Sequence, residues 1–196
     1  MVGWDFRQLL AIRKKSHMSS QDFGVAHNGW RAELTEPSLL SSGQSASENE
    51  SKMTRMKDTS RRLMFHGMFL FLLGLLTGFA EQHFANMRMG LAAHLEGVMN
   101  GTFLLALGAI WTHVRLSATA TAIAFWTVLY GTYFNWLITL IAAVYGTAAL
   151  SPITGAGHSG KPWQETFVTD GFMSVGIAIV IASALVLWGL RQQGSE

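Results

Sequence analysis

Four long apolar stretches follow one another along the chain, separated by short polar segments. They cover residues 63–79, 91–111, 118–145 and 167–190. Each is long enough for an α-helix to cross the hydrocarbon core of a bilayer, which takes roughly 20 residues. The polar segments between them, EQHFANMR, THVRLS and SPITGAGHSGKPWQE, contain residues that commonly end helices. The pattern predicts an all-α fold, an integral membrane four-helix bundle.

The segment ahead of the first apolar stretch has a different character. Residues 1–56 include runs such as SLLSSGQSASENESK, which are rich in Ser, Glu, Gln and Gly. Such a run buries too little apolar surface to offset the entropy lost on ordering. We therefore expect residues 1–56 to form a disordered or dispensable extension, and residues 57–196 to form the membrane domain.

The composition agrees with a membrane location. The 196-residue chain is 49% hydrophobic and only 13% charged, which is too few charges for an ordinary soluble surface. It has no cysteine, which excludes disulfides, thiolate metal sites, iron–sulfur clusters and cysteine nucleophiles. Any metal chemistry must therefore rest on His, carboxylate or Tyr side chains.

The formal net charge of +2 does not indicate a nucleic-acid-binding protein, because the basic residues gather beside the first apolar stretch. The positive-inside rule places such a cluster in the cytoplasm. With an even number of spans, both termini are expected to be cytoplasmic, in the bacterial inner membrane. Five basic residues form the cluster: Lys52, Arg55, Lys57, Arg61 and Arg62.

The second apolar stretch begins with polar side chains, which are expensive in a bilayer. It contains His94, Glu96 and Asn100. Asn100 follows His94 by about 9 Å along a helix and a third of a turn around it, so both can border a cavity beside a neighbouring helix. Asn135, inside the third stretch, is an amide that needs hydrogen-bonding partners. We expect Glu96, near the end of its span, to lie at the membrane interface or to pair with Arg88.

Glycines spaced four apart occur in the first two stretches, as Gly74 with Gly78 and as Gly97 with Gly101. This spacing puts both glycines of a pair on one helix face, where a second backbone can approach closely. We interpret the first pair as helix packing. The second pair continues the helix face that begins at His94, and a bare face beside an imidazole leaves room for a flat ligand. Gly97 and Gly101 are therefore predicted to bind a cofactor.

Several segments resemble the hydroxylaminobenzene mutases, a family of small membrane enzymes. The resemblance covers residues 61–190 and is carried by RRLMFHGMFLFLLGLLTG, NMRMGLAAHLEGVMNGTFLLALG, WTVLYGTYFNWLITLIAAVYGT and PITGAGHSGKPWQE, of which HLEGVMNG is the most specific part. It implies an isomerase, a mutase that rearranges an aryl hydroxylamine to an ortho-aminophenol without net redox change. The implied partner is a small aromatic substrate of nitroaromatic degradation.

A more distant resemblance, to styrene oxide isomerase, implies a cofactor. His94, Asn100 and Gly101 match the AHxxxxxNG segment of that family. In the family the histidine is the axial ligand of a b-type haem, ferric iron acts as a Lewis acid on the epoxide oxygen, and the subunits form trimers. The resemblance therefore implies haem b with His94 as its metal ligand, and a homo-oligomer.

The same resemblance implies catalytic roles for Asn100 and Asn135, because Asn135 falls near an asparagine of the family's third helix. The pattern then breaks, since the family's tyrosine four residues beyond that asparagine is Thr139 here. Either Tyr130 or Tyr133 takes over the polar role, or the substrate is held differently. Breaking an N–O bond without electron transfer needs an electrophile on the departing oxygen, which haem iron can provide.

Other interpretations of these residues stay open. A protonating carboxylate, Glu96 or Asp170, is the alternative electrophile, and an epoxide is the alternative substrate. A haem-binding electron-transfer subunit would need a second inward histidine, whereas the other histidines of the membrane part are expected at span ends or in loops: His66, His83, His113 and His158. A purely accessory membrane protein would leave His94, Asn100 and Asn135 without a purpose.

Overall fold

The computed structural model describes residues 38–192, with side chains from residue 47 onward. The elements of this part are α1 (Ser38–Ala80), η2 (Glu81–His83), α2 (Met87–Ile110), η3 (Trp111–His113), α3 (Ala118–Tyr145) and α4 (Pro162–Arg191), where η denotes a short 3-10 helix. Each of the four α-helices is long and apolar enough to cross a membrane. The predicted all-α class and the four spans are confirmed, and the protein is an integral membrane protein.

Local capping chemistry sets where the spans begin and end. The Asn86 side chain accepts a hydrogen bond from the amide of Met89 and so caps α2. Ser117 caps α3 in the same way. Gly146 ends α3 with a φ of 67°, a left-handed conformation that glycine adopts without steric strain. Pro162 is the first residue of α4, where no intrahelical amide bond is needed.

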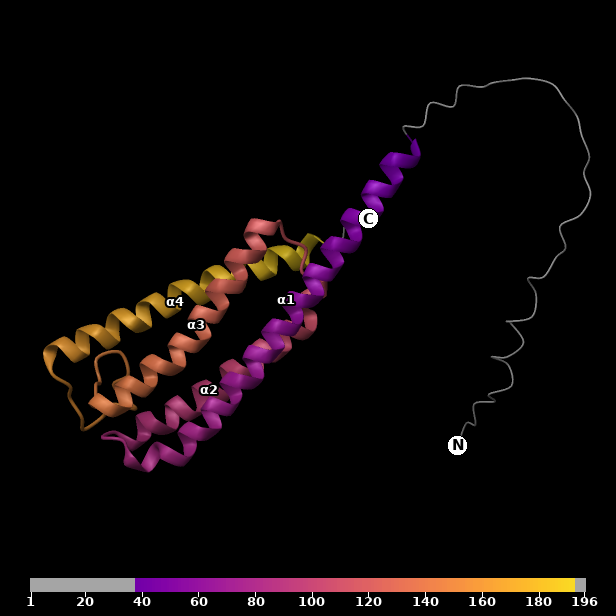
Figure 1. Ribbon diagram of the computed structural model, residues 1–196. Helices are drawn as coiled ribbons and strands as arrows, with labels where there is room; N and C mark the ends of the chain where they lie inside the picture. Colours follow the sequence, from indigo (N-terminus) through magenta and orange to yellow (C-terminus); the bar gives the residue numbers. More distant parts are fainter. Residues whose placement is uncertain (1–37, 193–196) are drawn as a thin grey trace, which may run out of the picture. The chain divides into compact units, whose positions relative to one another are not determined.

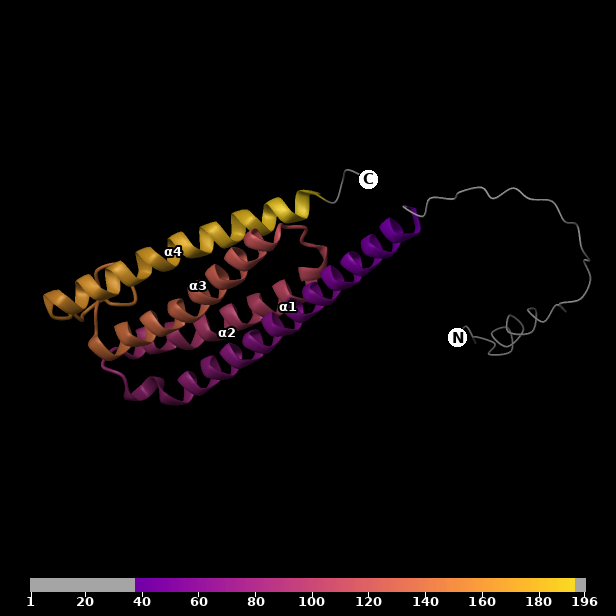
Figure 2. The same ribbon diagram turned by 45° about the horizontal axis from the view of Figure 1, so that its top comes forward.

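The helices lie side by side, and consecutive helices run in opposite directions (Figures 1 and 2). Side-chain hydrogen bonds tie α3 to each of the other three helices: Trp136 to Thr77 of α1, Asn100 of α2 to the Thr132 carbonyl, and Tyr130 to Ser174 of α4. The third helix therefore contacts all three other helices. Helix α2 carries most of the candidate site and packs against both α1 and α3.

Helix α1 extends far ahead of the first apolar stretch. The predicted disorder of residues 1–56 is wrong for residues 38–56, which are helical and run unbroken into the first span; residues 1–37 lie outside the described residues. Glu48 precedes Lys52 by four positions and Asp58 precedes Arg62 by four, a spacing at which opposite charges stabilise a helix. Whether residues 1–56 are dispensable stays a prediction.

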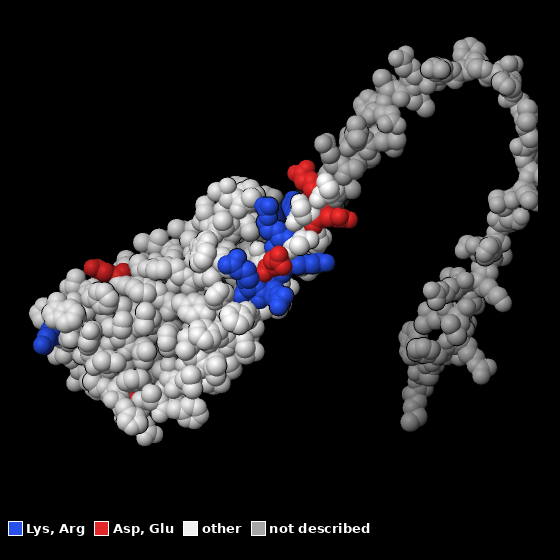
Figure 3. Space-filling model, in the orientation of Figure 1, with Lys and Arg blue, Asp and Glu red and all other residues white. Residues whose placement is uncertain are grey.

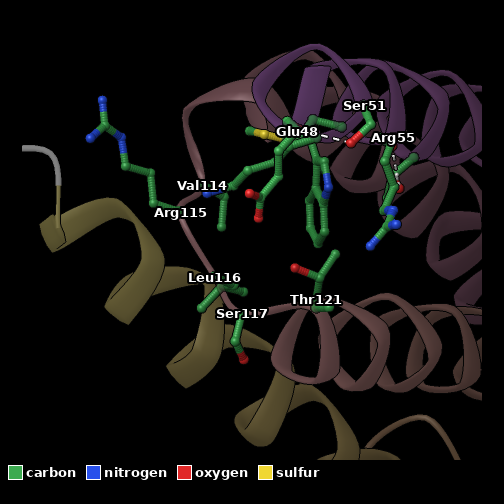
Figure 4. A pocket seen from close by; sticks show the side chains of 13 residues that line it. Glu48, Ser51, Arg55, Val114, Arg115, Leu116, Ser117 and Thr121 are labelled. Carbon is green, nitrogen blue, oxygen red and sulfur yellow. Dashed lines mark hydrogen bonds between the residues drawn. The ribbon is translucent and has the colours of Figure 1, made fainter. Parts of the chain in front are cut away.

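Basic side chains gather at one end of the helices (Figure 3). The five basic residues of α1 lie there with Arg115, whose amide bonds the Gly189 carbonyl at the end of α4. Arg88 and Lys161, at the starts of α2 and α4, lie at the opposite end. A pocket of about 340 Å³ opens at the basic end between α1 and the start of α3 (Figure 4). Since His94 lies in the first third of α2, near the opposite end, this pocket is not part of the site described next.

Candidate active site

The start of α2 is fixed by Asn86, whose side chain is fully buried. Its backbone amide donates to the carbonyl of Ala143 near the end of α3 at 3.0 Å, and its side-chain amide donates to the carbonyl of Thr154 at 2.8 Å. These two bonds hold α2 between α3 and the loop that follows it. They therefore set how far along the bundle axis the polar residues of α2 lie.

The loop of residues 146–161 is held by a carboxylate of α4. Glu165 accepts hydrogen bonds from the backbone amides of Ala148, Ala149 and Gly160 at 2.8–3.1 Å. The ring of His158 donates to the Ala85 carbonyl at 3.1 Å, just before α2. The loop thus connects the start of α4 to the start of α2.

His94 is oriented by the neighbouring helix α1. Its Nδ1 atom lies 2.8 Å from the carbonyl oxygen of Gly74. A carbonyl only accepts, so Nδ1 carries the proton and Nε2 keeps its lone pair for a ligand. A Cβ atom on Gly78 would lie 2.8 Å from the same Nδ1 atom, so only glycine leaves room for the ring there. The first glycine pair therefore does more than pack helices. The Gly74 carbonyl binds the imidazole, and Gly78 leaves the space in which the ring lies.

The predicted cofactor face of Gly97 and Gly101 is occupied by α1. A Cβ atom on Gly97 would collide with the backbone of Gly74, and one on Gly101 would lie 2.5 Å from the Phe71 nitrogen. The prediction that these two glycines bind a flat cofactor is therefore wrong for the described chain. Their missing side chains let two helix backbones meet, which is the ordinary use of this spacing in membranes.

Glu96 accepts hydrogen bonds from one side-chain amide of its own helix, α2, and from one of α3. Its Oε2 atom accepts hydrogen bonds from the Nδ2 atoms of Asn100, at 3.3 Å, and of Asn135. The Asn100 Nδ2 atom also donates to the carbonyl oxygen of Thr132 at 3.3 Å. These two acceptors match the two N–H groups of Asn100, whereas Asn135 keeps one N–H that no described residue accepts. We call Glu96, Asn100 and Asn135 the Glu96 cluster.

The expected location of Glu96 is wrong. Helix α2 begins at Met87, so Glu96 lies about 14 Å into it rather than near its end. The carboxylate is half-buried and bonds the two amides, and no ion pair joins it to Arg88 within residues 47–192. Asp170, the other candidate acid, is exposed on α4. Of the two carboxylates, only Glu96 belongs to a polar cluster.

The imidazole and the Glu96 cluster lie on different flanks of α2. Successive residues of a helix turn by about 100°, so Glu96 is rotated about 200° from His94. The contacts agree, because His94 meets α1 whereas Glu96 and Asn100 meet α3. Helix α1 packs on Gly97 between them. The described chain therefore does not bring His94 and Glu96 into one cavity.

Comparison with known proteins identifies the family. The family model described as styrene oxide isomerase matches residues 59–191, a range that contains His94 and the whole Glu96 cluster. The chain belongs to the styrene oxide isomerase family. No solved structure is significantly similar to the chain.

Two curated relatives are similar over the same region. Hydroxylaminobenzene mutase HabB of Ectopseudomonas oleovorans is 47% identical over 133 residues, which is 67% of this chain and 81% of that protein. Hydroxylaminobenzene mutase HabA of the same organism is 39% identical over 129 residues, which is 65% of this chain and 96% of that protein. The resemblance seen in the sequence is confirmed, and the chain is an isomerase.

The two tyrosines expected to replace the family's tyrosine lie away from the Glu96 cluster. The Tyr133 hydroxyl donates to the His66 carbonyl at 3.1 Å, and the Tyr130 hydroxyl lies 2.8 Å from the Ser174 hydroxyl of α4. Thr139, at the family tyrosine's position, donates to the carbonyl of Asn135 within its own helix. None of these hydroxyls bonds Glu96, so the structure does not support a catalytic role for Tyr130 or Tyr133.

His66 lies near the start of the first apolar stretch, and its ring faces helix α3. Its Nδ1 atom is 3.2 Å from the Tyr133 hydroxyl. Gly74, which binds His94, follows His66 by eight residues or about 12 Å of helix, too far for both imidazoles to bind one iron. An apolar groove of about 530 Å³ runs beside this pair and is lined by Phe65, His66, Phe69, Trp126, Leu129, Tyr130 and Tyr133.

The donor set of the described residues suits one type of metal group. Residues 47–192 contain no cluster of three or more His, Asp or Glu side chains that could hold a metal ion. A haem differs from a bare ion because it needs only one axial protein ligand. His94 has the required arrangement, with one ring nitrogen donating to a carbonyl and the other free. His94 therefore meets the requirement for an axial haem ligand.

Proposed function

We propose that the protein rearranges an aryl hydroxylamine, such as hydroxylaminobenzene, to the ortho-aminophenol. Two relatives named as hydroxylaminobenzene mutases support this substrate class. A span-forming environment also suits an apolar aromatic compound that partitions from lipid. The hydroxyl group moves from nitrogen to the adjacent ring carbon, and no electrons are gained or lost overall.

The proposal includes haem b held by Nε2 of His94. The observation that carries it is the hydrogen bond from His94 Nδ1 to the Gly74 carbonyl, which fixes the imidazole with Nε2 as its ligand atom. When bound, ferric haem would supply a Lewis acid for the oxygen that leaves nitrogen. The absence of a side chain at Gly78 leaves the space that the ring occupies in this orientation.

The amides of the Glu96 cluster bind the polar end of the substrate in this proposal. Asn135 offers the better donor, because one of its N–H groups is unused by the described chain, whereas both N–H groups of Asn100 have acceptors. A hydrogen bond from Asn135 to an oxygen that gains negative charge would stabilise the transition state. Asn100 then orients Glu96 and ties α2 to α3.

A homo-oligomer completes the proposed site. Since His94 and the Glu96 cluster lie on opposite flanks of α2, haem on His94 would face a neighbouring copy rather than this chain's own Asn135. A closed ring of identical subunits, such as a trimer, repeats this pairing at every interface. The basic end seen in Figure 3 supports cytoplasmic termini in the inner membrane.

Two measurements on the purified, detergent-solubilised protein test the proposal. Hydroxylaminobenzene should be converted to 2-aminophenol, identified by chromatography, and the protein should show a ferric haem absorption band. Protein that is folded but yields no aminophenol would refute the mutase assignment. Protein that turns over hydroxylaminobenzene without any haem band would refute haem and leave the mutase assignment standing.

Styrene oxide is the second candidate substrate, because the matching family model carries that name. An epoxide also needs an electrophile on its oxygen, so the same His94 arrangement would serve. A competition assay with both compounds separates the two. Higher kcat/KM for the epoxide would reverse the order of the candidates.

A further inference from the structure

The two carboxylate oxygens of Glu96 have different environments. Oε2 accepts hydrogen bonds from amides on two helices, Asn100 of α2 and Asn135 of α3. Within residues 47–192 no group hydrogen-bonds Oε1. In residues 47–192, the only buried side-chain oxygen or nitrogen without a hydrogen-bond partner is Oγ1 of Thr147. The unpartnered Oε1 atom of Glu96 is therefore not buried, and it is accessible to solvent or a ligand. One oxygen is therefore fixed by the protein, and the other is available to a ligand.

A purely structural role does not account for this carboxylate. An ionisable side chain inside a span is costly, and no Lys or Arg of the described chain forms an ion pair with Glu96. The side-chain amide of Asn100 on α2 already donates to the backbone carbonyl of Thr132 on α3. This neutral hydrogen bond holds the two helices together without a charged group. A carboxylate that only linked the two helices would also not need an oxygen without a hydrogen-bond partner, such as Oε1. The arrangement is that of a carboxylate oriented to accept a proton.

The proposed reaction contains a proton transfer that needs such a group. After the N–O bond breaks and the C–O bond forms, the ring carbon that bears the new hydroxyl still carries its hydrogen, and the nitrogen is an imine. Breaking that C–H bond returns its electron pair to the ring and restores aromaticity, while the imine nitrogen must gain one proton. Atoms and electrons balance if one group removes the carbon-bound proton and a proton is returned to nitrogen.

We infer that Glu96 is this group, a catalytic base whose Oε1 atom takes the ring proton and then passes it to the nitrogen. The two amides on Oε2 keep the carboxylate facing the substrate, and they leave Oε1 as its basic oxygen. Removal of a proton by a positioned side chain typically contributes a factor on the order of 10²–10⁴ to a rate. This inference rests on the proposed hydroxylamine substrate and not on the haem.

The test compares the wild type with Glu96→Gln, which keeps the shape and removes the basic oxygen. Hydroxylaminobenzene with deuterium at both ortho positions is the probe. The variant should lose about 10²-fold or more in kcat with little change in KM, and its residual turnover should show a primary deuterium isotope effect larger than that of the wild type. Asp170→Asn, which changes an exposed carboxylate of α4, is the matched control and should behave like the wild type in both readouts.

Glu96→Gln at the wild-type rate with an unchanged isotope effect would overturn the inference and leave the proposed function intact. Wild-type protein that makes no aminophenol would overturn both. If Glu96→Gln does not insert in the membrane, Glu96→Ala is assayed with and without added formate. Formate should restore part of the turnover if a missing base is the defect, and absence of rescue in folded Glu96→Ala protein would count against the base.

Discussion

The imidazole of His94 and the backbone carbonyl of Gly74 are joined by a hydrogen bond of 2.8 Å between helices α2 and α1, across 20 residues of sequence. The bond fixes both the tautomer and the direction of the ring, because the carbonyl has only lone pairs to offer. It also makes the glycines of α1 part of the site.

His94→Ala should abolish haem binding and turnover together, because it removes the axial ligand. Absorption spectra and product formation on the same preparation check this. His113→Ala is the control, since His113 is exposed in η3 and its ring lies at hydrogen-bonding distance from the neighbouring Thr112 hydroxyl. A His94→Ala protein with full haem content and full activity would show that this histidine is not the ligand.

Gly78→Ala should weaken haem binding although Gly78 itself is no ligand. The added methyl group would lie 2.8 Å from His94 Nδ1, so the ring must leave its bond to Gly74. Gly176→Ala is the control, because a Cβ atom there meets nothing within 4 Å and alanine favours a helix by roughly 1 kcal/mol over glycine. Equal haem occupancy in the two variants would contradict the claim that Gly78 provides the space for the His94 ring.

Asn135→Ala should keep the haem spectrum and lower turnover on the order of 10²-fold, the scale for one lost donor at developing charge. Asn100→Ala should lower turnover less, because both of its N–H groups bond the protein. It should instead lower stability by about 2 kcal/mol, because it removes two hydrogen bonds that are each worth about 1 kcal/mol. Steady-state kinetics and thermal unfolding of both variants check the order. A larger catalytic loss for Asn100→Ala would exchange their roles.

Activity should reappear when His94→Ala and Asn135→Ala chains are produced together. Each variant alone has one defective half of the site, but a mixed oligomer contains interfaces at which an intact His94 meets an intact Asn135. Differently tagged chains allow the mixed species to be purified and assayed. Mixed oligomers no more active than either parent would place both residues in a site formed within one chain.

Tyr133→Phe should leave turnover unchanged and lower stability by about 1 kcal/mol, because its hydroxyl bonds the His66 backbone and not the Glu96 cluster. Thermal unfolding and the mutase assay measure the two effects separately. Loss of activity at unchanged stability would return Tyr133 to the catalytic residues.

The helices could be predicted from the sequence because each span is a long apolar run with local stop signals. The third helix matches residues 118–145 at both ends, since Ser117 and Gly146 act on their own neighbours in the chain. Helix α2 begins four residues before the predicted stretch, because the charged Arg88 and the small Gly90 interrupt the apolar run in its first turn. That error placed Glu96 near the membrane surface.

The contacts of the site could not be predicted, because they depend on how the helices rotate against each other. Glu96 and Asn135 are 39 residues apart, and nothing in either segment specifies the other. The spacing of Gly97 and Gly101 indicates a close approach but does not say whether a ligand or a helix makes it.

The carboxylate of Glu165 gives the loop after α3 an unusual dynamic property. The amides of Ala148, Ala149 and Gly160 belong to no regular helix, yet each is bonded to that side chain. Hydrogen–deuterium exchange should therefore be slow at these three amides and should accelerate in Glu165→Gln. The same loop is also hydrogen-bonded to Ala85 and Asn86, just before α2. A sliding motion of α4 would therefore be transmitted to the first turn of α2. A displacement at one end of the chain's last helix would thus alter the axial position of the helix that carries His94 and Glu96.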